Sequence, residues 1–239
     1  LPTSSQNERR NLAKHFVQRR RPDIDEWQEG NIFPVRETAE LTYKLSGKWS
    51  EFFDHVLDYC AEIISSAGTD ERKQRLNFWG TLALLRCVSS SPDAAIKALR
   101  TRNLNDLGTK EIEDQLEDQI FDGDSDHLVE DDMEPAAAGT ENSKIEKLIL
   151  EAQTLSGEKG DPKLKVLKDQ LTELIAEKFN PVVFCRYIAT AHYLKDQLVK
   201  EFKGVTVEVI TGEITSDERK DKVDAMADAE QRLLIATDC

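Results

Sequence analysis

Polar or flexible residues stand in pairs directly after three short apolar segments near the end of the chain. The pairs are Arg186 with Tyr187, Thr211 with Gly212, and Thr237 with Asp238. A cation, hydroxyl groups, a flexible glycine and a carboxylate together suit contacts with phosphate or sugar groups. The alternative is that they are ordinary capping and turn residues, which any connection between a strand and a helix requires.

The segments around these pairs alternate between strand and helix patterns. Residues 181–185, 205–210 and 232–238 are short and apolar, whereas residues 189–202 and 215–228 have helical spacing. This order predicts an α/β fold with a partial, parallel three-stranded βαβαβ unit and right-handed crossovers. Ligands bind such sheets beyond the carboxyl ends of the strands, so the three pairs would share one edge. The last strand would be an edge of this partial sheet unless another segment covers it.

A helical region precedes this unit. Apolar spacing predicts helices over residues 50–66, 69–90 and 91–102, with Trp79 among the inward-facing side chains of the second. We therefore expect a helical subdomain over residues 50–109. Two more amphipathic helices follow Ser143, and the second has Asp161 as its N-terminal cap.

Charge is spread unevenly along a chain whose formal net charge is −14. Residues 9–21 hold six basic side chains and no acidic one, which predicts a basic helix and favours phosphate binding and a solvated helix end equally. Residues 110–142 hold thirteen acidic side chains and one lysine, which predicts a disordered acidic linker rather than a calcium site. The alternating residues 31–46 predict a strand or an isolated extended segment.

Several other classes of protein and site are disfavoured. The four cysteines and four histidines are scattered, so no zinc-type spacing exists and no metal site is expected. Buried free thiols favour a reducing compartment, and we expect a cytoplasmic location. No apolar run is long enough to span a membrane.

Four segments resemble motifs of superfamily-two helicases, in the order that the family has them. VVFCRYIATAHYL resembles motif IV, TGEITSDERKDKVDAMAD resembles the segment that follows it, and RLLIATDC resembles the start of motif V. DPKLKVLKDQL resembles the helix that leads into the second RecA-like lobe of Swi/Snf-like bacterial ATPases. HFVQRRRPDI resembles the segment after their first lobe. The resemblance covers residues 160–239 well and residues 9–26 loosely.

The resemblance implies an ATP-driven motor that moves on nucleic acid, with double-stranded DNA favoured over RNA. Thr237 would contact the nucleic-acid backbone, and Asp238 would face the nucleotide cleft. The other residues along the nucleic-acid track would be Arg186, Tyr187, Thr211 and Gly212. ATP and Mg²⁺ would be the cofactors of the parent protein, and the N-terminal RecA-like lobe of the same polypeptide would be its partner. Arg186-Tyr187 departs from the usual motif IV, where a short polar residue and threonine are common.

The catalytic parts of such a motor are missing from this sequence. Gly47-Lys48 lacks the rest of a GxxxxGK[ST] phosphate loop, and no apolar strand precedes the acidic pair Asp25-Glu26. We therefore expect a fragment with no catalytic residue, inactive alone: an inter-lobe linker over residues 1–49, the helical and acidic segments, and the first half of the second lobe over residues 143–239. The alternative is a non-catalytic protein-interaction module with a small α/β domain. A Rossmann-like enzyme is disfavoured because no GxGxxG follows a strand.

Overall fold

The computed structural model describes residues 37–69, 71–105 and 142–237, together with six isolated residues among the first fifteen. The chain divides into two compact units, Leu1–Leu41 and Thr42–Cys239. Most of the predicted basic helix and almost all of the predicted acidic linker lie outside the described residues. Residues 37–46 are exposed and form no helix or strand, so this part of the alternating stretch is not a strand. The predicted domain boundaries stay predictions.

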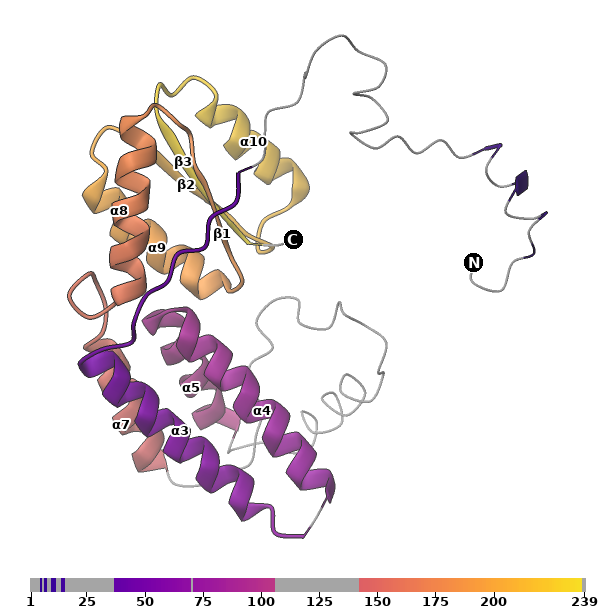
Figure 1. Cartoon of the computed structure of the whole chain (residues 1–239), viewed down its shortest axis with the longest axis vertical. Coiled ribbons are helices and arrows are strands. Elements are labelled where there is room, and N and C mark those ends of the chain that lie inside the picture. Colours follow the sequence, from indigo (N-terminus) through magenta and orange to yellow (C-terminus); the bar gives the residue numbers. More distant parts are fainter. Residues whose placement is uncertain are drawn as a thin grey trace. The chain divides into compact units, whose positions relative to one another are not determined.

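In the described residues, four helices form the helical part of the second unit (Figure 1): α3 (Lys48–Ser66), α4 (Glu71–Ser90), α5 (Pro92–Asn105) and α7 (Asn142–Gln153). Ser91 caps α5 as its sequence predicts, because the Ala94 N–H donates a hydrogen bond of 3.1 Å to the Ser91 hydroxyl oxygen. The four helices bury one shared apolar cluster, which includes Trp49, Phe52, Val56, Leu84, Leu99, Ile145 and Leu148.

The buried face of α4 differs from the predicted one. The Trp79 side chain is 46% exposed, whereas Asn77 and Thr81 are buried. The Asn77 amide donates a hydrogen bond of 2.8 Å to the Ile63 carbonyl oxygen, and the Thr81 hydroxyl donates one of 2.8 Å to the Asn77 carbonyl oxygen. These bonds satisfy the two polar groups inside the bundle. Apolar residues occur all around α4, so their spacing alone did not identify the inward face.

The α/β part contains the predicted parallel sheet. Its elements are α8 (Pro162–Ala176), β1 (Val182–Cys185), α9 (Ile188–Glu201), β2 (Thr206–Ile210), α10 (Ser216–Met226) and β3 (Arg232–Thr237). Both strand pairs are parallel. Figure 1 shows α8 and α9 on one face of the sheet and α10 on the other. The face beneath α8 and α9 is a second apolar core, which includes Leu164, Leu171, Leu198, Val207, Val209, Leu233 and Ile235.

The position of β3 corrects one prediction. The strand order is β1-β3-β2, so the last strand lies in the middle of the sheet and not at its edge. β3 has the longest apolar run of the three strands and buries Leu233 and Ile235 completely, which favours the position with a neighbour on each side. β1 is an edge strand instead. Its side chains Val182 and Phe184 are 47% and 72% exposed, although the strand is almost entirely apolar.

Candidate nucleic-acid interface

The register of the sheet brings the three predicted polar pairs to one edge. Cys185 of β1 pairs with Thr237 of β3, and Ile210 of β2 pairs with Ala236 of β3. The three parallel strands therefore end together, and Arg186 and Thr211 follow directly. This confirms the predicted common edge, which we call the rim. The binding role of its residues stays a prediction.

The rim residues differ in how accessible their side chains are. Arg186 and Gly212 are exposed, whereas Thr211 and Thr237 are only 3% and 4% exposed. Asp238, the residue expected at the nucleotide cleft, lies outside the described residues. Among the described residues, the rim therefore offers an exposed guanidinium group and a stretch of exposed backbone at a glycine. The two threonine side chains are largely covered in this conformation.

A hydrogen-bonded chain of side chains lies beside the rim. The Thr211 hydroxyl donates to a Glu213 carboxylate oxygen at 3.3 Å, and His192 Nε2 lies 3.0 Å from that oxygen. The hydrogen bond from His192 lowers the pKa of Glu213, and the contact with Thr211 adds to this effect. Glu213 thus stays ionised at neutral pH and orients both partners. The negative charge at this side of the rim is already compensated in part.

The spacing of His192 and Glu213 in the sequence does not by itself predict their contact. The predicted order of strands and helices does indicate that the two residues lie near each other. His192 lies in the second turn of the helix that leaves β1, and Glu213 comes two residues after Thr211, which directly follows β2. Both positions therefore belong to the carboxyl edge of the sheet.

Tyr187 is the rim residue whose position the sequence did not predict. Its side chain is 7% exposed and belongs to the apolar cluster of the four helices. Burial raises the pKa of its hydroxyl strongly, and a hydrogen bond with the Cys87 thiol adds to this rise. The ring thus packs against α4, which favours a packing role. Its part in nucleic-acid binding stays a prediction.

Hydroxyl groups also join the helical part to the α/β part. The Thr190 hydroxyl on α9 lies 2.8 Å from the Ser90 hydroxyl and 2.8 Å from the Ser91 hydroxyl, between α4 and α5. α5 also packs along α9. The connection that follows β1 is therefore held by the helical part as well as by the sheet.

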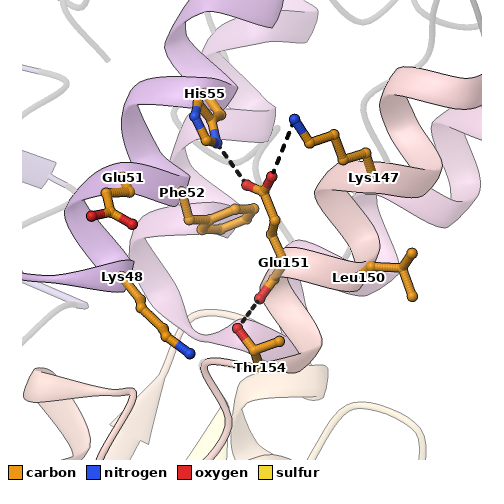
Figure 2. A pocket seen from close by; sticks show the side chains of 8 residues that line it. All are labelled: Lys48, Glu51, Phe52, His55, Lys147, Leu150, Glu151 and Thr154. Atoms are coloured by element: carbon orange, nitrogen blue, oxygen red, sulfur yellow. Dashed lines mark hydrogen bonds and ion pairs between the residues drawn. The ribbon is translucent and has the colours of Figure 1, made fainter.

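A separate hollow of about 390 Å³ lies between α3 and α7 (Figure 2). Figure 2 shows Glu151 at its centre, where one carboxylate oxygen lies 2.7 Å from His55 Nδ1 and the other lies 3.9 Å from Lys147 Nζ. Its lining residues are Lys48, Glu51, Phe52, His55, Lys147, Leu150, Glu151 and Thr154. The central charges are paired with each other, so nothing in the hollow points to a ligand.

Within the described ranges, no three His, Cys, Asp or Glu side chains are grouped as a metal ion would require. No helix in that part of the chain has the length and apolar character of a membrane span.

Comparisons with known proteins support the helicase-like fold of the α/β part. No curated protein sequence gives a significant match. The helicase domain of Pyrococcus furiosus Hef is a similar solved structure, with a TM-score of 0.44 and 17% identity over 80% of this chain. The alignment spans 43% of that protein's chain. The family described as "Helicase conserved C-terminal domain" matches residues 162–239. Residues 162–239 are therefore similar to a helicase C-terminal domain.

Proposed function

We propose that this chain supplies part of the nucleic-acid track of an ATP-dependent DNA helicase or translocase. The single observation that supports it best is the rim, where three parallel strands of the region similar to a helicase C-terminal domain end beside the exposed Arg186 and Gly212. α9 begins two residues after Arg186, and no side-chain hydrogen bond caps its N-terminus. Backbone N–H groups and a guanidinium group at one edge suit contacts with phosphates and do not read bases.

The remaining parts of the motor would lie outside the described residues. ATP and Mg²⁺ would belong to the complete protein, because this sequence contains no phosphate-binding loop that fits them. Asp238 would face the nucleotide cleft, and the N-terminal RecA-like lobe would be the partner. We further propose that the motor is of the Swi/Snf-like type, acts on double-stranded DNA, and works in the cytoplasm, where the buried thiols Cys60, Cys87 and Cys185 would stay reduced. The chain alone would not hydrolyse ATP.

The test is the binding of short duplex DNA by the 239-residue chain, measured by fluorescence anisotropy over a series of salt concentrations. We expect weak binding that falls as salt rises, because phosphate contacts release counterions. Arg186→Gln should weaken binding several-fold at low salt. It should also reduce the slope of log affinity against log salt by about 0.9, the value for one lost phosphate contact.

The matched control is Lys200→Gln. Lys200 is an exposed cation in the last turn of α9, at the opposite edge of the sheet from the rim. Lys200→Gln removes one positive charge, as Arg186→Gln does, but away from the rim. It should therefore leave the salt slope unchanged if the rim binds DNA. Equal effects of both variants would mean non-specific attraction, and no salt-dependent binding at all would favour the alternative of a non-catalytic protein-interaction module. ATP turnover by the purified chain with DNA would contradict the expected inactivity.

A further inference from the structure

Three cations occur at or near the ends of three elements, β1, α4 and α8. Arg186 directly follows the strand, Arg86 lies near the end of α4, and Lys163 lies in the first turn of α8. All three side chains are exposed. We call them the β1-end cluster.

Contacts through buried residues bring Arg86 to this place. Arg86 is the neighbour of Cys87, and Arg186 is the neighbour of Tyr187, whose side chain packs into the same cluster as Cys87. Although burial raises the pKa of the Tyr187 hydroxyl, the guanidinium groups of Arg186 and Arg86 both act to lower it. Both guanidinium groups are therefore near enough to the Tyr187 hydroxyl to act on it electrostatically.

Lys163 reaches the same region from α8. Its Nζ atom lies 3.5 Å from the carbonyl oxygen of Ser90, at the end of α4. Burial raises the pKa of the Cys185 thiol, at the end of β1, to about 11, and the Lys163 ammonium group acts in the opposite direction. Lys163 therefore lies near both the end of α4 and the end of β1.

The charges of the β1-end cluster are not neutralised within the described part of the chain. Within the described residues, none of the ion pairs includes Arg86, Lys163 or Arg186. The chain has 46 acidic and only 32 basic residues, so carboxylates are abundant as potential partners. Lys163 acts electrostatically on the Asp161 carboxyl, which is buried at the cap of α8, but no ion pair engages any of the three cations within the described residues. Exposed cations of this kind in so acidic a chain indicate a site for an external polyanion.

We propose that Arg86, Lys163 and Arg186 together bind phosphates of one nucleic-acid backbone, so that the helical part supplies a portion of the track. This inference rests on the proposed function and extends it from the rim to α4 and α8. Side chains from three elements would follow the backbone through charge alone, without reading its sequence. The contact of Tyr187 with α4 would then have a function, because it holds Arg86 beside Arg186.

The same anisotropy titrations test the inference with Arg86→Gln and Lys163→Gln. Each change should weaken binding several-fold at low salt and reduce the salt slope by about 0.9. Arg86→Lys keeps the charge and should restore most of the affinity and slope. Lys163→Gln leaves the cap of α8 intact, because Asp161 accepts the backbone N–H of residue 163 and not its side chain. Far-UV circular dichroism and thermal unfolding should match those of the wild type.

The outcomes separate the two proposals. If Arg186→Gln weakens binding while Arg86→Gln and Lys163→Gln bind as tightly as Lys200→Gln, the rim binds DNA without the helical part, and the further inference is wrong. If the wild-type chain shows no salt-dependent binding, the proposed function fails and the inference fails with it. An effect of Arg86→Gln that Arg86→Lys does not rescue would also contradict a role through charge.

Discussion

Tyr187 stands between β1 and α9, at a position where the resemblance to helicases implies a nucleic-acid contact. In the structure its ring packs into the helical part, and its hydroxyl bonds to the Cys87 thiol. A buried aromatic side chain contributes several kcal/mol to stability through its packing, whereas a neutral hydrogen bond contributes much less. The two interpretations therefore predict different effects of substitution.

Tyr187→Ala should lower the free energy of unfolding by about 3–5 kcal/mol, because it removes a ring from the cluster. Tyr187→Phe keeps the ring and should cost only about 1 kcal/mol. Urea unfolding followed by circular dichroism would measure both values. If Tyr187→Ala lowers the free energy of unfolding by less than about 1 kcal/mol but causes a large loss of DNA affinity, the ring binds nucleic acid and does not serve packing.

At the scale of elements, α8 shows how one side chain positions a helix against the sheet. Asp161 Oδ1 accepts the Lys163 N–H and the Leu164 N–H, both at 3.0 Å, and Oδ2 accepts the Tyr193 hydroxyl at 3.1 Å. The cap thus joins α8 to α9. Burial raises the pKa of the Asp161 carboxyl, although the hydrogen bonds from Leu164 and Tyr193 act to lower it.

Asp161→Ala should cost about 1–2 kcal/mol, because it removes the cap, whereas Asp161→Asn keeps an oxygen that can accept the same N–H groups and should cost less. A carboxyl whose pKa is raised by folding contributes most stability below its unfolded pKa and loses that contribution as pH rises through its folded pKa. The stability of the wild type relative to Asp161→Asn should therefore fall as pH rises above about 4, the ordinary pKa of an aspartate carboxyl. Urea unfolding of both proteins over a series of pH values measures this difference in the free energy of unfolding. A difference that rises with pH would contradict the raised pKa of Asp161.

At the scale of the whole molecule, the helical part and the α/β part of the second unit are joined by buried contacts. Thr190 bonds to Ser90 and Ser91, α5 packs along α9, and Tyr187 is shared by the two parts. These contacts couple the two cores, so we expect them to unfold as one cooperative body.

Hydrogen exchange measured by mass spectrometry can test this coupling. The slowest amides of α3 and of β3 should open with the same free energy. Thr190→Val keeps the side-chain shape but leaves buried hydroxyls without a partner. It should therefore lower the opening free energies of α3 and β3 equally, by about 1–3 kcal/mol. Ser65→Ala is a suitable control, because Ser65 bonds only to its own helix at an exposed site. A loss confined to β3 would show that the two parts unfold independently.

The sequence alone determined the features that depend on neighbouring residues. The caps at Ser91 and Asp161 and the parallel βαβαβ order follow from local propensity and apolar spacing. The common edge of Arg186, Thr211 and Thr237 also follows, because parallel strands with short connections must end together. The match of residues 162–239 to a helicase C-terminal domain agrees with the motifs found there.

Only the tertiary structure decided what depends on contacts between distant segments. The central place of β3, the exposed face of β1 and the inward face of α4 result from competition among several apolar surfaces, which no local pattern resolves. The burial of Tyr187 beside Cys87 joins positions one hundred residues apart. Sequence spacing carries no information about such a pair, because its geometry depends on how the two cores pack together.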